Sequence, residues 1–373
     1  MNRGEVWRAT RDALAMPLVA FAAVQLVIWL AANSVSVDPR LGASYVRWDS
    51  NNYLSIATQG YYLQFDGDSV VGGNAAWFPA YPLAIRTFKP SRLTPAKTGK
   101  LISSVFAFGL LVTVWGLTAD AERGTRSLLL LLAAFFPGFI YYHAVFPISM
   151  AACLGLLAIV CCARGRYLAA GALGAIAAAS YTTGFLLAAA LALGVFRDAA
   201  LSWGARLAAL ASGPLLVALG LASVLLYQQQ TVGWDGFFRM QRDYCATERA
   251  DVVSMFLANT RYVWSGDLRP EFLFQLETVL MVVLMLVVAG ICWQQRRSLR
   301  PLEWLLLANA LVFWLFPHLV GPAGRNSPRA DALLVGMTPL LARLPFRGLL
   351  LLLVVFVALG SGICAGFFST LLM

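Results

Sequence analysis

The sequence predicts an all-α, polytopic membrane protein. Only 12% of the 373 residues are charged and the mean hydropathy is +0.73, whereas a soluble domain carries about 25% charged residues. Apolar runs of near-spanning length recur at 13–33, 207–227, 272–293 and 349–371, as a hydrocarbon core of roughly 30 Å requires. Only helices satisfy their own backbone in such a core, and the alternation typical of a barrel is missing, so these runs are predicted to be helices.

The first apolar run indicates a retained span rather than a cleaved signal peptide. It is about 20 residues long and lacks a small-residue cleavage site followed by a soluble segment. Arg3, Arg8 and Arg11 precede it, so the positive-inside rule places the N-terminus in the cytoplasm. Keeping the later Arg-rich turns on the same side gives about eleven crossings, at 13–33, 101–118, 127–145, 148–163, 167–181, 183–196, 207–227, 272–293, 302–319, 332–343 and 349–371.

The segment WFPAYPLAIRTFK at 77–89 is too short to span and contains Arg86, so we expect an interfacial helix on the outer surface. In the competing reading this segment crosses, every later loop changes sides, and five basic turns lie outside. In the first reading, the whole chain (1–373) forms one membrane domain. Its large polar loops, 34–100, 228–270 and 318–331, then lie on the external side. Together they predict a pocket at the membrane surface.

The net charge of +10 does not predict a nucleic-acid partner, because in a membrane protein the place of the charges matters more than their sum. Five of the six cysteines lie in apolar runs, and no CxxC or Cys/His spacing suggests a metal site. We therefore expect the cysteines to pack as small hydrophobic residues.

The stretch YVRWDSNNYLSIATQGYY (45–62) holds the main candidate for chemistry. Asp49 and Tyr53 are spaced i, i+4, so on a short helix they share one face, with Asn52 beside them. A single carboxylate in an external site could act as a general base toward a hydroxyl. Alternatively, Asp49 caps a helix or pairs with Arg47, and composition alone favours that structural role.

This stretch, followed by AAWFPAYPL at 75–83, resembles the first external loop of the GPI mannosyltransferase family that adds the second mannose, with its bacterial relatives. Members carry RWD, a Tyr four residues after the Asp, I-A-x-x-G-Y, and A-x-F-P-x-x-P. The matched positions are Arg47, Trp48, Asp49, Tyr53, Ile56, Ala57, Gly60, Tyr61, Ala76, Phe78, Pro79 and Pro82. Weaker similarities follow at 233–244 and 326–339. The resemblance implies a GT-C-like bundle with interfacial helices in the long first external loop.

In such enzymes the acid of the first external loop is taken as the catalytic base. The resemblance therefore implies that Asp49 deprotonates an acceptor hydroxyl, which attacks the anomeric carbon while phosphate leaves from the opposite face, with inversion. A departing phosphate calls for cations, and arginine binds phosphate oxygens in pairs. The candidates for binding the donor phosphate are Arg325, Arg329, Arg242 and Arg47, and binding to lipid headgroups is the alternative.

Aromatic and polar side chains of the loops are candidates for contacting the sugar. Aromatic rings suit stacking on sugar faces, and they equally suit a belt at the membrane interface. The candidates are Trp48, Asn52, Tyr53, Tyr61, Trp77, Phe78, Asp235, Gln241 and His318. His318 in particular suits either sugar contact or simple interfacial placement.

One feature departs from the family pattern. Many relatives carry a second acid after the third span, in a P-x8-Y-[ST]-E stretch, whereas Phe146, Pro147 and Ile148 align there and the Glu is missing. His143, one turn earlier, is a candidate replacement, although a lone His at a helix end is more often satisfied by a neighbour. No cofactor is predicted and a divalent metal is not supported. The missing acid leaves a non-catalytic subunit with this fold as an alternative.

The leading hypothesis is an inverting glycosyltransferase of the bacterial inner membrane. It would move a hexose, with mannose expected, from a polyprenyl-phosphate donor to a glycolipid, glycan or protein acceptor at the external face. The alternative is a transporter or flippase of a lipid-linked substrate. Transporters place ionisable residues within their spans and show inverted repeats, whereas these apolar runs are almost free of charge and show no convincing repeat.

Overall fold

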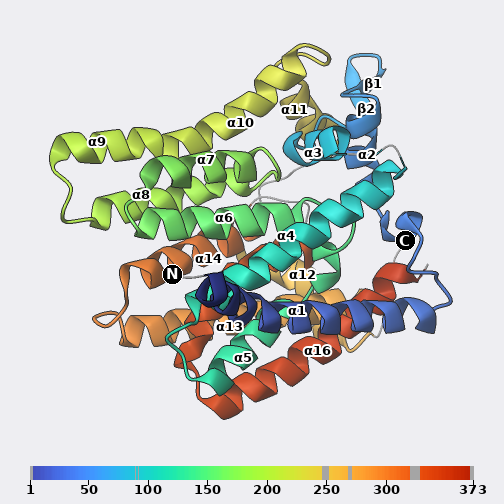
Figure 1. Ribbon diagram of the computed structural model, residues 1–373. Coiled ribbons are helices and arrows are strands. Elements are labelled where there is room, and N and C mark those ends of the chain that lie inside the picture. Colours follow the sequence, from blue (N-terminus) through green and yellow to red (C-terminus); the bar gives the residue numbers. More distant parts are fainter. Residues whose placement is uncertain are drawn as a thin grey trace.

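The computed structural model describes residues 3–88, 90, 92–245, 252–267, 271–319 and 328–369. Of the residues that the structure describes, about 75% are helical. The longer helices lie roughly along one direction, from Arg-rich turns at the left of Figure 1 to a small β-hairpin at the right. The sequence prediction of a helical, membrane-type protein is confirmed at this level.

Five stretches of helix within the described residues are long and apolar enough to cross a membrane. They are Asp12–Ser34 of α1 (Arg3–Ser34), α4 (Pro95–Leu117), Trp203–Gln229 across α9 (Trp203–Ser212) and α10 (Pro214–Gln229), α13 (Phe272–Gln294) and α16 (Phe346–Phe368). Shorter apolar helices are α6 (Ile148–Ala163), α7 (Tyr167–Ala178), α8 (Leu187–Arg197), which continues the 3₁₀ turn η3 (Gly184–Leu186), and α14 (Pro301–Leu319). The count of eleven crossings stays a prediction.

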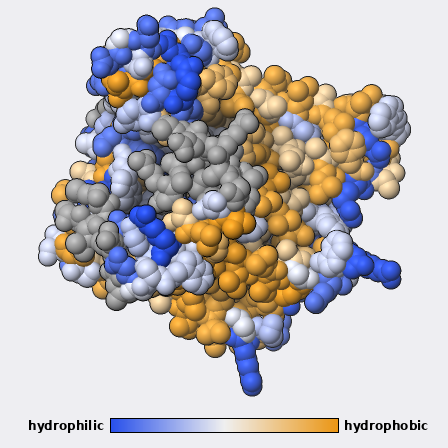
Figure 2. Space-filling view, turned by 180° about the vertical axis from the view of Figure 1, so that it is seen from behind, coloured by the Kyte–Doolittle hydropathy of each residue, from blue (hydrophilic) through white to orange (hydrophobic). Residues whose placement is uncertain are grey.

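Large apolar side chains are exposed along these helices, as a lipid-facing surface requires. Examples are Leu26 on α1, Leu219 on α10, Leu286 on α13 and Leu351 on α16, each more than half exposed. Figure 2 shows an apolar surface across the middle of the molecule, with hydrophilic residues gathered toward its two ends. This distribution is compatible with an integral membrane protein.

The predicted span at 127–145 is not one continuous helix. Helix α5 (Arg123–Ala134) stops before Pro137 and Gly138, and a 3₁₀ turn, η2 (Phe139–Tyr142), follows. Proline has no N–H to continue the helix, and Gly138 adopts φ of +80°, which favours glycine. An added Cβ at Gly138 would lie 2.8 Å from Pro328 O, so this turn also lets the later chain approach closely.

The first loop contains more secondary structure than the interfacial helices that the sequence predicts. It contains η1 (Gly42–Tyr45), α2 (Ser50–Thr58), an antiparallel hairpin of β1 (Leu63–Asp66) and β2 (Ser69–Gly73), and α3 (Ala80–Phe88). The hairpin was not predicted. Nine residues of α3 extend only about 13 Å, so this helix, which covers most of 77–89, is too short to cross a membrane.

Short elements make up the other two predicted loops. The loop at 228–270 holds α11 (Gly236–Arg239), a π-helical turn η4 (Met240–Tyr244) and α12 (Val252–Ser265). Most of 318–331 lies outside the described residues. The chain resumes with α15 (Pro328–Ala332) and continues as the 3₁₀ helix η5 (Leu333–Arg343), where a crossing was predicted.

The Arg-rich turns lie together at one end of the bundle. Arg300 pairs with Asp120 at 2.7 Å, and Arg343 Nη2 donates to Glu303 at 2.8 Å. A cavity of about 400 Å³ is lined by 117–125, 298–303 and 339–343, and another of about 420 Å³ by 162–167, 194–200 and 299–305. Since both cavities include residues near Arg300, all these turns share one end, opposite the hairpin in Figure 1.

Small residues allow α7 to pack with its backbone in contact with the end of α9 and with α10. An added Cβ at Gly171 would lie 2.0 Å from Ser212 O, and one at Gly220 would lie 2.4 Å from Ala175 O. Side chains larger than glycine therefore cannot be placed at these positions without separating the helices. Close helix packing by small residues is a common way to associate helices in membranes.

Replacing Gly220 by alanine should destabilise the protein. The added methyl group meets backbone rather than a flexible side chain, and overpacking of this kind costs about 1–3 kcal/mol. The measurement is thermal unfolding of the purified protein in detergent, followed by tryptophan fluorescence. Gly290→Ala on α13 is the matched control, because nothing lies within 4 Å of its added Cβ. Equal unfolding midpoints for the two variants would contradict the packing argument.

Candidate active site

The end of α16 holds the turn that contains Arg47, Trp48 and Asp49. Arg47 Nε donates to Phe367 O at 3.1 Å, and its Nη2 donates to Phe368 O at 3.4 Å. A helix leaves its last carbonyl groups without backbone partners, so Arg47 caps the C-terminus of α16. Its guanidinium, a predicted phosphate ligand, is engaged there in this structure.

The chain turns sharply at Trp48, whose φ of +44° is uncommon for a residue with a side chain. Trp48 is 37% exposed, and its ring packs edge-on against Phe367, with 5.5 Å between ring centroids. Directly after this turn Asp49 occupies the N-cap position of α2, but its carboxylate makes no capping hydrogen bond. The sequence offered two local roles for Asp49, a helix cap or a partner of Arg47. The carboxylate of Asp49 takes neither role and contacts a distant residue instead.

Asp49 forms an ion pair with Arg329, 280 residues further along the chain. Arg329 Nη1 donates to Asp49 Oδ2, and the two side chains are only 25% and 31% exposed. Burial lowers the pKa of Arg329, but the nearby Asp49 carboxylate and tyrosines more than offset this and raise the pKa above its ordinary value. A charged, half-buried pair that solvent still reaches therefore joins α2 to α15.

The turn at Gly138 and a buried hydroxyl hold α15 in place. Pro328 lies against Gly138, where only glycine leaves room for the Pro328 carbonyl. Tyr142 O–H donates to Ala332 O at 2.6 Å, so η2 fixes both ends of this short helix. Arg329 lies between these two anchoring points, which explains why so short a segment can present its side chain to Asp49.

Aromatic side chains surround the ion pair. The Arg329 guanidinium lies 5.6 Å from the centroid of Phe146, and Tyr53 and Tyr141 pack edge-on against the same ring. Burial raises the pKa of Tyr53, and Tyr53, Tyr141 and Tyr181 each interact electrostatically with both Asp49 and Arg329. The three phenols keep their protons at neutral pH and remain available as hydrogen-bond donors.

A buried pair of carboxyl groups, Glu277 of α13 and Asp331 of α15, lies next to the tyrosines of this cluster. Glu277 is fully buried and Asp331 is 7% exposed, and the two groups interact directly. No N–H or hydroxyl donor within the described residues reaches either oxygen of Glu277. Two buried carboxyl groups in contact are best satisfied when they share one proton.

The remaining residues of the motif support α2. Tyr61 O–H donates to Trp77 O at 2.7 Å, and Phe78 is buried against Phe237. The Arg86 guanidinium caps the other end of α2 through Ala57 O at 2.8 Å. These contacts give Tyr61, Trp77 and Phe78 structural roles, and Trp77 is partly buried against both apolar clusters of the molecule.

Several predicted site residues lie outside the cluster around Asp49. Arg242 pairs with the adjacent Asp243 at 2.6 Å, and Asp243 also accepts a hydrogen bond from Val70 of the hairpin. Asp235 and Gln241 belong to the same segment, at the N-cap of α11 and in η4. The segment 235–243 therefore packs with the hairpin, and no contact of Arg242 or Asp235 with Asp49 is found among the described residues.

The remaining predicted site residues are His143, His318, Asn52 and Arg325. His143 is buried, and Gln25 Nε2 lies 2.9 Å from its Nδ1, which makes Nδ1 the acceptor and the ring neutral. This is the satisfied role that the sequence offered as an alternative to catalysis. Asn52 is half-buried on α2, three residues after Asp49. His318 lies in the last turn of α14, and Arg325 lies outside the described residues.

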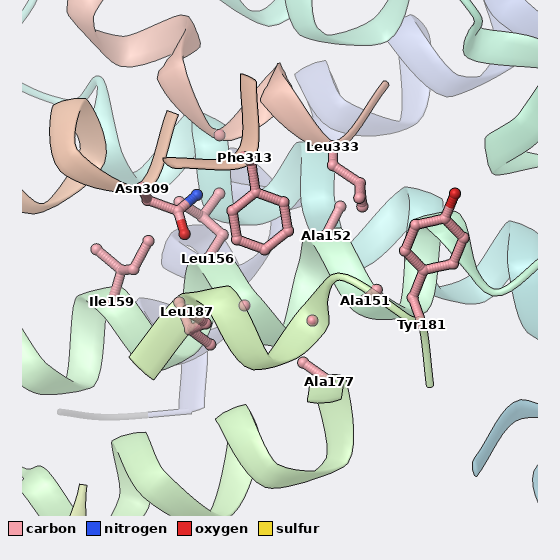
Figure 3. A pocket seen from close by; sticks show the side chains of 13 residues that line it. Ala151, Ala152, Leu156, Ile159, Ala177, Tyr181, Leu187, Asn309, Phe313 and Leu333 are labelled. Carbon is pink, nitrogen blue, oxygen red and sulfur yellow. The ribbon is translucent and has the colours of Figure 1, made fainter. Parts of the chain in front are cut away.

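A small cavity adjoins the cluster at Tyr181. It lies between α6, α7, α14 and η5, and its walls are mainly apolar, with Tyr181 and Asn309 as polar members (Figure 3). Its volume of about 20 Å³ accommodates roughly one water molecule. This cavity is too small for a hexose, so a sugar bound near Asp49 would have to lie elsewhere.

Comparison of the chain with protein-family models gave no match, and comparison with curated proteins gave none either. The resemblance in the first loop therefore stays a prediction. Within the described residues, no three His, Cys, Asp or Glu side chains gather at one point. The structure thus defines no candidate metal centre in that part of the chain.

Tyr141, Tyr181, Asp331 and Glu277 were not among the predicted site residues. A signal for one of them exists in the sequence, because Glu277 is the single charged residue in the apolar run 272–293, and such residues are commonly functional. Asp331 follows Arg329 by two positions. The tyrosines carry no comparable signal, because their place depends on the turn at Gly138 and on the loop before η3.

Replacing Glu277 by glutamine should flatten the pH dependence of stability. Burial raises the pKa of Asp331 above its ordinary value, so the folded state holds its proton more tightly than the unfolded state. Stability should then fall as the pH rises from the ordinary carboxyl range near 4 toward the raised pKa. The glutamine amide can donate to an ionised Asp331 and remove much of this loss.

The measurement is the unfolding midpoint in detergent between pH 5 and pH 8. Glu271→Gln is the matched control, because Glu271 is an exposed acid at the start of the same helix. A pH dependence that is equally steep in the wild type and in Glu277→Gln would show that the pair does not share a proton.

Proposed function

We propose that the protein is an inverting glycosyltransferase that moves a hexose, with mannose expected, from a polyprenyl-phosphate donor to an acceptor at the external face of a bacterial inner membrane. The observation that carries the proposal is the pairing of Asp49 with Arg329. Sequence motifs 280 residues apart marked one as a base and the other as a phosphate ligand, and the two side chains meet in a half-buried site that solvent reaches.

The residues present suit this chemistry. Asp49 Oδ takes the proton of the acceptor hydroxyl while the oxygen forms its bond to the anomeric carbon. The bond between that carbon and the phosphate oxygen breaks, and the phosphate leaves with the electron pair. Arg329 offers paired N–H donors to the departing phosphate, and the Tyr53, Tyr141 and Tyr181 hydroxyls are further donors near the site.

The grouping of charges supports an external site. The Arg-rich turns gather at one end of the bundle, and α2 and the hairpin lie at the other end (Figure 1). The pair of Asp49 with Arg329 places α15 beside α2. If the Arg-rich end faces the cytoplasm, as the positive-inside rule requires, Asp49 faces the opposite side. A sugar donor on the outer leaflet would then reach it.

The substitution Asp49→Asn should reduce sugar transfer by about 10²–10⁴-fold, the usual contribution of a general base. The measurement is transfer of radiolabelled mannose from polyprenyl-phosphate mannose to a membrane-lipid extract by the purified protein. Asp243→Asn removes a carboxylate from a different arginine, Arg242, and is the matched control. Undiminished transfer by Asp49→Asn would exclude Asp49 as the base.

A transporter or flippase is the second candidate, and one observation favours it. Glu277 is a buried carboxyl group and the sixth residue of a long apolar helix, and transporters commonly place ionisable residues inside such helices. A non-catalytic subunit is the third. If the wild type transferred no sugar but moved lipid-linked sugar between the leaflets of proteoliposomes, and Glu277→Gln stopped this movement, the transporter would replace the glycosyltransferase.

A further inference from the structure

The ion pair between Asp49 and Arg329 conflicts with the roles of these residues in the reaction. In the structure Arg329 Nη1 donates a hydrogen bond to Asp49 Oδ2, so this carboxylate oxygen is already engaged. In an inverting transfer the base and the leaving phosphate lie on opposite faces of the sugar. The arrangement that the free protein adopts is therefore not the arrangement of the reacting complex.

Simple distances show the size of this conflict. A base lies within about 3 Å of the hydroxyl oxygen whose proton it takes, and that oxygen approaches the anomeric carbon to about 3 Å. The phosphate lies beyond that carbon, so it is more than about 6 Å from the Asp49 carboxylate. Arg329 Nη1, which donates to Asp49 Oδ2, therefore cannot also donate to the leaving oxygen, and while this contact lasts the carboxylate oxygen that should take the acceptor proton is engaged by a cation.

We propose that the donor phosphate displaces Asp49 from Arg329, so that Asp49 is released to act as a base only after the donor has bound. This inference rests on the proposed function and adds regulation of the same site. The donor should accordingly bind before the acceptor. Without a donor, the ion pair holds the base inactive.

The surroundings of Arg329 allow such a change of partner. Its side chain is 25% exposed, so an incoming phosphate can reach it. The face of Phe146 lies 5.6 Å from the guanidinium, and an aromatic face attracts a cation whichever anion it binds. The backbone of α15 is held independently, at Gly138 and through Tyr142, so Arg329 can exchange anions without unfolding the helix.

Binding of a polyprenyl phosphate without sugar tests the proposal, because it measures the competition directly and needs no catalysis. Affinity is measured for wild type, Asp49→Asn, Arg329→Gln and the double variant in nanodiscs. Asp49→Asn should bind about fivefold more tightly, since the phosphate no longer competes with an ion pair of about 1 kcal/mol. Arg329→Gln should bind about tenfold more weakly, through loss of charged hydrogen bonds.

The double variant separates competition for Arg329 from a general charge effect. If Asp49 acts through Arg329, then Asp49→Asn changes the affinity only when Arg329 is present. An equal gain in both backgrounds would mean that Asp49 merely repels phosphate, and the proposal would be wrong. No gain in the wild-type background would mean that Arg329 keeps its contact with Asp49, which also overturns it.

Asp243→Asn is the matched control for the removal of a carboxylate from an arginine at the same end of the bundle. It should leave the affinity unchanged, and a fivefold gain there would contradict the proposal. If Arg329→Gln does not fold, Arg329→Met, which is also uncharged and of similar length, replaces it in both the single and the double variant. Failure of the wild type to bind polyprenyl phosphate would reject the glycosyltransferase itself, whereas binding that is insensitive to Asp49 would reject only the displacement.

Discussion

A single ion pair, Asp49 with Arg329, determines how the site is built. A guanidinium next to Phe146 and several buried tyrosines would be costly without a counter-ion, and Asp49 supplies one. The carboxylate is fixed because Arg47 ties the preceding turn to the end of α16. The guanidinium is fixed because η2 holds α15. Two unrelated parts of the fold therefore converge on this contact.

Much of this arrangement could be predicted from the sequence one residue at a time. Apolar runs predicted the long helices, since length and composition decide whether a helix suits a membrane. Residue type and the resemblance of the first loop selected Asp49 and Arg329 separately. Their pairing could not be predicted, because it depends on Gly138 interrupting the span at 127–145 and leaving room for α15. A local backbone turn thus decides a contact across 280 residues.

The hairpin at 63–73 was missed for a different reason. Its two-residue turn is Gly67–Asp68, a recognised hairpin signal, and Gly67 adopts φ of +57°. The sequence prediction placed only interfacial helices in this loop and no strands. Missing the hairpin also affected the predicted set of site residues, because segment 235–243 packs with this hairpin through Asp243 and Val70. Arg242 therefore belongs to a separate surface, which residue type alone could not show.

Charge balance links the two states of the site. When a phosphate takes Arg329, the guanidinium keeps a counter-ion, but Asp49 loses its own. Asp49 Oδ2 is then open to an acceptor hydroxyl, whose proton it can take. Binding of the donor would therefore expose the base at the same time as it places the leaving group beside Arg329. The missing second acid of the family pattern is compatible with this scheme, since it needs one carboxylate and one arginine that changes its partner.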